Sequence, residues 1–529
     1  MRWNLVAKVT EAEESFMRGL GARSKFYVFL RKVRHQLFDA AMQRELETMF
    51  SPKPRGNNPV PAAQLAMLSL LQAYTSTSDD DAIEECKAND RWKLVLGTLG
   101  SSCAPCSKKT LVFFRSRMVK HGMFEKLLAK TVQLAKDTGL FDPKKAGKLR
   151  IAIDSAPLRG AGRVEDTINL IGHAVRSVLI GLAAWMGTTW CDLAQDAQLH
   201  VLKQDQSVKA ALDIDWDVTD ARHQALRRVI VDAHQTIAWV ITTHGALVEL
   251  AGLQGALALV HRIIEQDVER TPAGFVIKQG VAPERIISVS DVDMRHGRKS
   301  STQTINGYKR YDAIDVDSEL TIAACVLPAN RPESEGADKM AATIQKLGVV
   351  EEIQVDRAFL PSRLVDDLDA QGAGILAKPY RMSNHGRFDK TQFQINTGES
   401  LVQCPAGKTA DIRGSTAKFS IETCQACPLR SRCQSAHAKH GRTISVHPNE
   451  PLMQELRDRS ATAEGREQLR ERVKIEHSLA HLTASQGRRA RYRGERKNDA
   501  DLARHATIKN LFVLRRHLEK KDSSLLRAA

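Results

Sequence analysis

The sequence predicts a mixed α/β protein in which a helical N-terminal domain precedes a sheet interrupted by a helical insert. Apolar residues at helical spacing fill the first 141 residues. Short β-favouring runs then appear near residue 150 and return after residue 281. The intervening segment, 165–280, has helical character throughout. We therefore expect one sheet whose strands come from both sides of an insert.

Length and composition indicate a globular protein of several domains. A chain of 529 residues exceeds what one core usually organises, and 42% apolar with 26% charged residues is ordinary globular composition. The 78 Lys and Arg against 62 Asp and Glu give a net charge of +16. Such a charge favours a polyanionic partner such as nucleic acid, although solubility alone would also explain it.

The chain carries no feature that predicts export or a membrane partner. Residues 1–7 lack the apolar core of a signal peptide, and the most apolar stretches, 178–194 and 237–260, contain charged or polar residues that favour buried helices. Four tryptophans in the insert predict core packing there. Nine cysteines, an odd number, favour reduced thiols or metal ligation, so we expect a cytoplasmic protein.

The N-terminal domain, residues 1–141, is expected to be helical. Leu65, Leu68 and Leu71 form an apolar stripe at near-helical spacing. The expected helices are 36–50, 61–74, 109–120 and 124–140. A polar stretch, 142–148, separates this domain from the first strand.

The sheet is expected to be built from residues 148–164 and 281–400. Its first strand, 149–153, should end in Asp154 at its carboxyl tip. The later expected strands are 285–289, 308–316, 320–326, 352–355 and 374–377, with helices at 335–347 and 361–371. The turn Asp315–Ser318 predicts an antiparallel hairpin, and the strand and helix alternation that follows predicts a mixed sheet.

Three separated acids could converge on one site. Asp154 and Asp356 each follow an apolar strand, and acids at the ends of adjacent strands can lie together, although Asp also commonly caps turns. Glu476 lies on a helix beside the apolar stripe of Ile475 and Leu479. The alternative for Glu476 is an exposed ion pair with Arg472, four residues earlier.

A cluster of cysteines predicts a structural zinc site in the segment 401–440. Four thiolates suit a tetrahedral Zn²⁺, and the alternative is unligated buried thiols. The expected ligands are Cys404, Cys424, Cys427 and Cys433, with His437 or His440 able to replace one of them. Cys103 and Cys106 also form a Cys-x2-Cys pair, but no second pair stands nearby in sequence.

A basic run follows the helix of Glu476 within the C-terminal region 450–529. The run consists of Arg488, Arg489, Arg491, Arg493, Arg496 and Lys497, with Tyr492 among them. A solvated loop is the alternative, but its position after the Glu476 helix favours contact with a phosphate backbone. Lys299, Lys309 and Arg310 are expected to add to the same surface.

Taken together, these motifs resemble the DDE transposases of bacterial insertion sequences, and among them the insertion sequence 1182 family. The stretches that carry the resemblance are Ile151–Ser155, Asn306–Lys309, Ala313–Asp315, Gln354–Phe359, Arg472–Glu476, Cys404–Lys408, Cys424–Arg430, Arg489–Gly494 and Ile508–Leu511. The helical region before Phe141 is similar too, so the resemblance covers most of the chain except the insert. Relatives with a Tyr, Arg, Glu and Lys signature would carry Tyr at Leu469 and Lys at Thr483.

The resemblance implies a fold, a reaction and partners. Asp154, Asp356 and Glu476 would be the three acids of an RNase H-like catalytic core, and Lys309 and Arg472 would contact DNA. Two Mg²⁺ or Mn²⁺ held by these acids would support phosphodiester cleavage and strand transfer. The protein would act as a homo-oligomer on target DNA and on transposon ends, and the N-terminal domain would bind those ends. It would be associated with the bacterial nucleoid. The competing interpretations are a metal-dependent nuclease of the same fold and a catalytically inactive, zinc-containing DNA-binding regulator.

Overall fold

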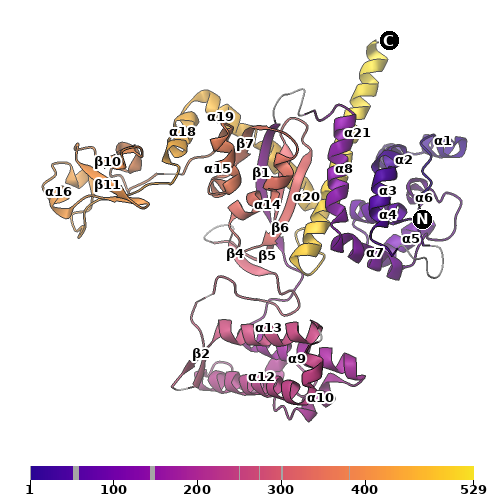
Figure 1. Cartoon of the computed structure of the whole chain (residues 1–529), viewed down its shortest axis with the longest axis horizontal. Coiled ribbons are helices and arrows are strands. Elements are labelled where there is room, and N and C mark those ends of the chain that lie inside the picture. Colours follow the sequence, from indigo (N-terminus) through magenta and orange to yellow (C-terminus); the bar gives the residue numbers. More distant parts are fainter. Residues whose placement is uncertain are drawn as a thin grey trace.

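The computed structural model describes residues 2–51, 59–142, 149–249, 251–272, 274–280, 282–298, 302–380 and 382–528. Figure 1 shows a central sheet with N-terminal helices on one side, a small β-rich unit on the other and the helical insert below. Residues 143–148 of the expected polar stretch, and Lys299 of the expected basic surface, lie outside the described residues.

The N-terminal part is helical, but it contains more and shorter helices than expected. The helices are α1 (Glu11–Arg18), η1 (Ala22–Ser24), α2 (Lys25–Leu37), α3 (Ala40–Glu47), α4 (Ala62–Thr75), α5 (Asp79–Ala88), α6 (Asp90–Leu96), α7 (Lys108–Lys120) and α8 (Met123–Asp137). The expected helix 36–50 is wrong, because α2 ends at Leu37 and a new helix, α3, begins at Ala40. Asp39 caps α3 by accepting the Met42 N–H at 2.8 Å.

The last helix of the chain joins the N-terminal helices in one core. Helix α21 (Glu495–Ala528) packs against α8 and α4, and in Figure 1 it rises between the sheet and these helices. The ring of Phe512 stacks on Phe26 with centroids 3.8 Å apart. Aromatic stacking of this kind adds to the gain from burying both rings. The two ends of the sequence therefore share one hydrophobic core, which also includes residues of the sheet.

The central sheet is mixed, as expected. Its strands are β1 (Leu149–Arg159), β4 (Arg295–Arg298), β5 (Thr304–Asp315), β6 (Thr321–Pro328), β7 (Val350–Val355) and β8 (Gly374–Ala377). Strand β5 pairs antiparallel with β1, β4 and β6, whereas β1, β7 and β8 run parallel to one another. The hairpin between β5 and β6 is confirmed, and the Asp315 carboxylate accepts the Ser318 N–H at 2.8 Å in its turn.

One expected strand does not form, and another is longer than expected. Residues 285–289 adopt no regular structure, because their backbone bonds with the root of the insert: Ile286 N–H donates to the Gln266 side chain and Ile287 C=O accepts the Glu165 N–H. The prediction that β1 ends at Asp154 is also wrong. Strand β1 continues to Arg159, since β5 pairs with it along that whole length.

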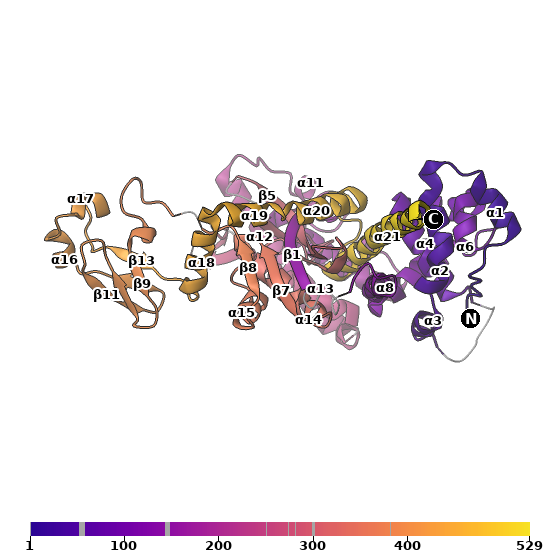
Figure 2. The same cartoon turned by 90° about the horizontal axis from the view of Figure 1, so that it is seen from above.

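Helices cover both faces of the sheet. Helix α14 (Glu333–Gln345) packs on one face so closely that a Cβ on Gly336 would lie 2.3 Å from the Tyr311 ring. Helix α20 (Val473–Gln486) packs on the other face, where Ile475 meets Ala152 of β1 and Ile314 of β5. The short η2 (Arg357–Phe359) and α15 (Arg363–Ala370) connect β7 to β8. Figure 2, in which the molecule is seen from above, shows α19 and α20 running across the sheet.

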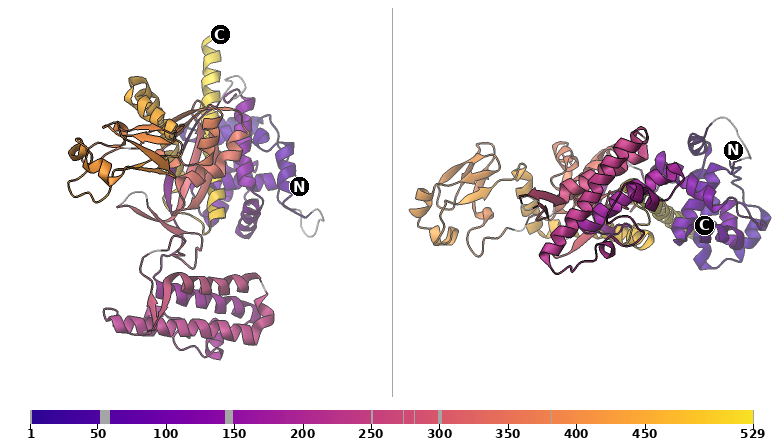
Figure 3. Two further views of the ribbon diagram at one scale, coloured as in Figure 1. Left: turned by 60° about the vertical axis from the view of Figure 1, so that its left-hand side comes forward. Right: turned by 90° about the horizontal axis from the view of Figure 1, so that it is seen from below.

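The insert is a helical unit with its own core, visible at the bottom of both Figure 1 and the left view of Figure 3. It contains α9 (Thr167–Met186), α10 (Trp190–Asp196), α11 (Val208–Leu212), α12 (Thr219–Val248) and α13 (Ala251–Asp267), closed by a hairpin of β2 (Val268–Thr271) and β3 (Gly274–Ile277). Helix α9 is long and apolar enough to cross a membrane, but 67% of its apolar window is buried here. Trp185 departs from the expected core packing, because it is 68% exposed.

The β-rich unit at the left of Figures 1 and 2 holds the cysteine segment. Its five strands are β9 (Gln394–Asn396), β10 (Leu401–Gln403), β11 (Thr409–Arg413), β12 (Thr416–Lys418) and β13 (Thr443–Ser445), all antiparallel in sequence order. It also contains η3 (Lys390–Gln392), α16 (Ile421–Gln425) and α17 (Arg430–Cys433). Helices α18 (Glu450–Ala461) and α19 (Ala463–Arg470) lead from this unit back to the sheet.

Candidate active site and nucleic-acid interface

Asp154 and Asp356 lie side by side at one edge of the parallel part of the sheet. The last paired positions of β1 and β7 are Ala152 and Gln354, so each aspartate stands two residues beyond the same pair. Neighbouring strands lie about 4.8 Å apart, which brings equivalent positions into reach of one ligand. Asp154 also shares its face of β1 with Ala152, on which α20 packs. The sheet therefore places both carboxylates beneath the start of α20.

Arg472, at the N-cap of α20, bridges the two aspartates. Its Nη2 lies 3.7 Å from Oδ2 of Asp154, and its Nη1 lies 3.5 Å from Oδ1 of Asp356. The residue is only 7% exposed, and its Nε has no hydrogen-bond partner. Charge-assisted hydrogen bonds between such groups are usually about 2.7–2.9 Å long, so this guanidinium is held by charge more than by directed bonds.

The electrostatics of Asp154 are those of a desolvated acid beside a second acid. Burial raises the pKa of Asp154 above its ordinary value, and the negative charges of Asp356 and Glu333 raise it further. The N–H of Ser155, which donates to Asp154 Oδ1 at 2.7 Å, and the charge of Arg472 oppose this shift. A cation is thus favoured at this point.

Glu476 lies on α20 one turn after Arg472, but it touches neither aspartate. Its side chain is exposed and, within the described residues, makes no ion pair or hydrogen bond. The alternative ion pair between Arg472 and Glu476 is not formed, because Arg472 points to the aspartates instead. Residues four apart on a helix share one face, so Glu476 stands on the side of α20 from which Arg472 reaches the sheet.

Residues that the sequence patterns did not single out anchor α20 to the sheet. Glu471, just before Arg472, pairs with Arg150 of β1 and accepts a hydrogen bond from Gln354 at 3.3 Å. Further along the helix, Ser478 donates to the buried Asp312, the cross-strand partner of Asp154. A buried Asp or Glu normally carries such partners. No spacing rule would have found these pairs, because their members come from three distant segments.

Two cations assigned to the DNA surface lie inside the protein instead. Arg310 is fully buried and donates to the Gly487 carbonyl at 2.7 Å and to Gln486 Oε1 at 3.0 Å, which fixes the end of α20. Lys309 is 8% exposed, with its Nζ 2.9 Å from a Glu333 carboxylate oxygen. Their positions follow from β5, which is covered on both faces. The expectation that Arg310 adds to a DNA surface is therefore corrected.

The aspartates have the chemistry for a divalent cation, although the three predicted acids do not form a cluster. Within the part of the chain that the structure describes, no three His, Cys, Asp or Glu side chains are grouped so as to hold a metal ion. Asp154 and Asp356 nevertheless offer adjacent carboxylates, the donors that Mg²⁺ and Mn²⁺ prefer. A single positive charge, that of Arg472, already lies between them. The two aspartates therefore fit a divalent cation, and Glu476 would have to move towards them to become a third ligand.

The basic segment, residues 488–497, contacts β1 at its last residue, Arg159. Its backbone forms a bridge with the strand: the Arg159 N–H donates to Arg488 C=O at 3.0 Å, and the Ala490 N–H donates to Arg159 C=O at 2.7 Å. All six predicted cations, Arg488, Arg489, Arg491, Arg493, Arg496 and Lys497, are exposed. Because β1 also carries Asp154, one rigid strand connects the basic segment to the acid pair.

Only some of these cations are free of protein contacts. Arg489 donates to the Ala161 carbonyl at 3.2 Å and Arg496 to the Lys120 carbonyl. Within the described residues, the side chains of Arg488, Arg493 and Lys497 have no ion pair or hydrogen bond. These three side chains are therefore free to contact a polyanion, and Arg489 and Arg496 keep their positive charge because their acceptors are neutral carbonyls.

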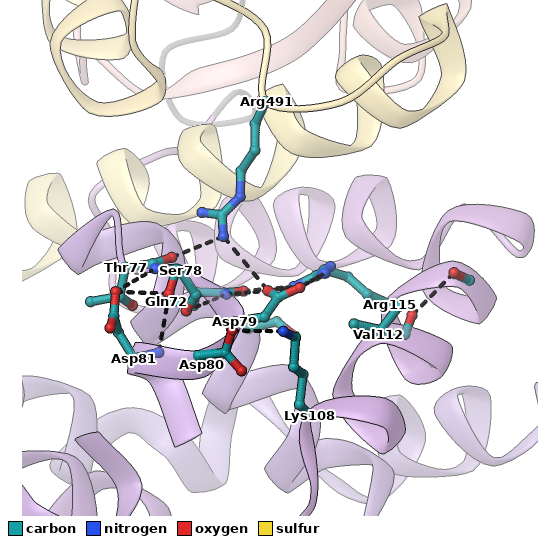
Figure 4. A network of polar contacts seen from close by, with 12 residues as sticks. Gln72, Thr77, Ser78, Asp79, Asp80, Asp81, Lys108, Val112, Arg115 and Arg491 are labelled. Carbon is teal, nitrogen blue, oxygen red and sulfur yellow. Dashed lines mark hydrogen bonds and ion pairs between the residues drawn. The ribbon is translucent and has the colours of Figure 1, made fainter. Parts of the chain in front are cut away.

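Arg491 ties the basic segment to the N-terminal helices. Figure 4 shows its guanidinium between the Thr77 carbonyl, at 2.9 Å, and Asp79 at the start of α5. Asp79 in turn receives two hydrogen bonds from Arg115 of α7, at 2.6 and 2.8 Å. The hydrogen bonds from Arg115 hold the pKa of Asp79 well below its usual range. Tyr492 completes the junction, with the Arg115 guanidinium 5.7 Å from its ring centroid.

The four predicted zinc ligands line one small cavity in the β-rich unit. Cys404, Cys424, Cys427 and Cys433 surround a space of about 30 Å³, together with the rings of the local core. Burial raises the pKa of Cys433, and the other three thiols raise it further. His437 and His440 are exposed and do not line this cavity. The donor set suits Zn²⁺, but the thiols are not drawn into a ligand cluster.

The second Cys-x2-Cys pair lies in the N-terminal helices. Cys103 is exposed and Cys106 is partly buried, close enough to the buried Cys86 for their charges to interact. Burial raises the pKa of Cys86 to about 12 and that of Cys106 to about 11. Neutral thiols of this kind behave as small apolar side chains.

Comparison with known families gives two matches. Residues 401–515 match a family described as a transposase DDE domain, and residues 20–117 match one described as a transposase domain, DUF772. The first range contains the cysteine segment, Arg472, Glu476 and the basic segment, whereas Asp154 and Asp356 lie outside both ranges. No curated protein and no solved structure matches the chain. The two matches support a transposase.

Proposed function

We propose that this protein is a DDE transposase that cleaves transposon ends and joins them to target DNA by two-metal-ion chemistry. The observation that carries the proposal is the pairing of Asp154 with Asp356 under Arg472 of α20. Two acids from adjacent parallel strands, with a third acid one helical turn beyond the bridging arginine, provide carboxylates for hard divalent cations.

We further propose that the sheet is the core of an RNase H-like fold. The strand order β6-β5-β1-β7-β8, with the first three strands antiparallel and the rest parallel to β1, supports this assignment. The match over residues 401–515 to a transposase DDE domain is in keeping with it. The narrower assignment to the insertion sequence 1182 family is part of the same proposal.

In the proposed reaction, Asp154 and Asp356 would hold the metal, and Glu476 would complete the ligand set when DNA is bound. The metal, when present, activates water or a 3′-hydroxyl and stabilises the leaving oxygen of the phosphodiester. The protein supplies rigidity: β1 and β7 fix the aspartates, while Glu471 and Arg150 hold the start of α20 against them. The proton lost by the attacking water or 3′-hydroxyl would pass to solvent on the exposed side of α20, where Glu476 lies.

The DNA would run from the acid pair along β1 to the basic segment. Arg488, Arg493 and Lys497 have free charges for phosphates there, and Arg489, Arg491 and Arg496 border them. We propose that the N-terminal helices, which Arg491 joins to this segment, bind the transposon end. We propose that the protein works as a homo-oligomer on paired ends in the bacterial cytoplasm, without a membrane partner, and that Zn²⁺ on the four cysteines stabilises the β-rich unit.

The test is a metal-dependent assay on DNA that carries the element's own terminal inverted repeats. We expect full-length protein with Mg²⁺ or Mn²⁺ to cut at the repeat ends and to join them to a second DNA. Cleavage without any joined product would favour a nuclease of the same fold. Specific binding of the ends without metal-dependent cleavage would favour an inactive, zinc-containing regulator and would reject the proposal.

A further inference from the structure

We propose that Arg472 is a displaceable counter-ion that occupies the metal position between Asp154 and Asp356 until a divalent cation arrives. This inference rests on the proposed function. It concerns how the same site is kept in order and controlled before metal loading. The juxtaposition that carries it is one guanidinium between two adjacent carboxylates.

The contact geometry shows a cation held in place without directed bonds. The two Nη–Oδ distances, 3.7 and 3.5 Å, exceed those of charge-assisted hydrogen bonds, which are about 2.7–2.9 Å. Arg472 is 7% exposed, yet its Nε has no partner. A guanidinium carries five donors in a fork that can bind a carboxylate bidentately. Arg115 does this with Asp79, at 2.6 and 2.8 Å, which makes the looser bridge at Arg472 a distinct arrangement.

The charges of the two carboxylates explain why a counter-ion is needed before the metal binds. Two adjacent carboxylates that are partly removed from water repel one another, and a metal-free pair would either take up a proton or move apart. One guanidinium cancels half of their charge and leaves the pair net negative. A divalent cation cancels all of it at shorter distance, so it should displace the single charge. The site can then stay ordered without metal and still bind one.

The helix start allows Arg472 to leave. Arg472 precedes the first residue of α20 and has no side-chain cap bond, so its side chain can turn without breaking the helix. The backbone around it stays fixed, because Glu471 is held by Arg150 and Gln354, and Lys474 donates to the Val316 carbonyl at 3.0 Å. Metal loading therefore moves one side chain, not the helix.

The first experiment measures Mn²⁺ affinity of the zinc-loaded, full-length protein by calorimetry, with the Asp154→Asn/Asp356→Asn double variant as background. An opposite charge within about 4–6 Å lowers a carboxylate's proton affinity by roughly ten- to a thousandfold, and we expect a similar effect on metal affinity. Arg472→Gln should therefore bind Mn²⁺ at least about tenfold more tightly than wild type. Arg470→Gln, which removes an exposed arginine two residues away, should leave the affinity unchanged.

The second measurement follows metal binding in the unmodified chain, and a variant serves only to identify one resonance. The Nε–H resonance of Arg472, identified by its loss in Arg472→Lys, should shift when Mg²⁺ is added, over the Mg²⁺ concentrations at which calorimetry of the unmodified chain shows binding. Equal Mn²⁺ affinity in wild type and Arg472→Gln, or an unmoved resonance, overturns the inference while leaving the metal site intact. If the double aspartate variant binds Mn²⁺ as well as wild type does, there is no metal at these acids, and the proposed function fails with it.

Discussion

The Nη2 atom of Arg491, in the basic segment, lies 3.6 Å from the Oδ1 atom of Asp79 in α5 (Figure 4). The contact joins a segment near the end of the chain to helices near its beginning. Asp79 can accept it because two hydrogen bonds from Arg115 already fix the carboxylate. The exposed cations beside Arg491 therefore sit on a rigid base, which suits a surface that positions DNA.

Asp79→Asn should destabilise the protein. The change leaves Arg115 and Arg491 without their shared anion, and breaking a mostly buried pair in this way costs roughly 2–4 kcal/mol of unfolding free energy. Asp80→Asn is the matched control, because Asp80 and its partner Lys108 are largely exposed, 71% and 54%, and such pairs contribute at most about 1 kcal/mol. Urea unfolding of both variants checks this; equal destabilisation would mean that the junction is not a structural joint.

Replacing Arg488, Arg493 and Lys497 with Ala should weaken DNA binding and flatten its dependence on salt. These are the cations of the segment without protein partners, so removing each bond to a phosphate should lower the slope of log K against log salt by about 0.9. Fold stability should not change. Binding isotherms at several salt concentrations measure the slope, with Arg470→Ala as an exposed control elsewhere. A slope equal to that of wild type would assign the segment to a solvated loop.

The purified protein should carry about one zinc per chain, and Cys424→Ser/Cys427→Ser should release it. Zinc ligation contributes to folding, so the β-rich unit should also unfold more easily in this variant. Cys103→Ser/Cys106→Ser removes the other Cys-x2-Cys pair and should keep the metal. Elemental analysis of freshly reduced protein is the measurement, and no zinc in the wild type would mean that the four cysteines are unligated thiols.

The stability of the protein should fall as pH drops from about 6.5 to 4, in part through His505. Burial, opposed by Asp501, lowers the pKa of His505 from 6.5 to about 4, so the folded protein holds the ring neutral while the unfolded chain protonates it. Its contribution is thus fully present above pH 6.5 and disappears as the pH falls towards 4, at most about 3 kcal/mol. His505→Gln should flatten the pH profile of unfolding free energy over this window; an unchanged profile would mean that the ring is not held neutral.

The sequence patterns predicted the mixed sheet better than its details. Apolar runs located β5 to β8, because each such strand is buried on both faces. The length of β1 was missed, because β5 pairs with it as far as Arg159. Pro157 fits in the strand because β7 no longer pairs there, which leaves an edge where a missing N–H costs nothing. Residues 285–289 had the composition of a strand, but their backbone partners belong to the insert.

For the site, sequence patterns could assign each acid to a strand or helix, but they could not predict which side chains would contact it. The strand ends predicted that Asp154 and Asp356 would meet, and the register of β1 and β7 gives the physical reason. The role of Arg472 could not be inferred, because spacing favoured its partner on the same helix, Glu476, over partners more than a hundred residues away. The ion pair of Lys309 with Glu333 is a further contact between distant residues that spacing could not predict.

The most direct test of the proposed function is to compare catalysis and DNA binding in Asp356→Asn. The change keeps the shape of the side chain and removes one metal ligand, which should cost several kcal/mol of transition-state stabilisation. Asp154→Asn and Glu476→Gln should behave alike, with end binding retained. We predict that cleavage and strand transfer with Mg²⁺ are abolished in all three variants. Joined DNA products from any one of them at the wild-type rate would contradict the assignment.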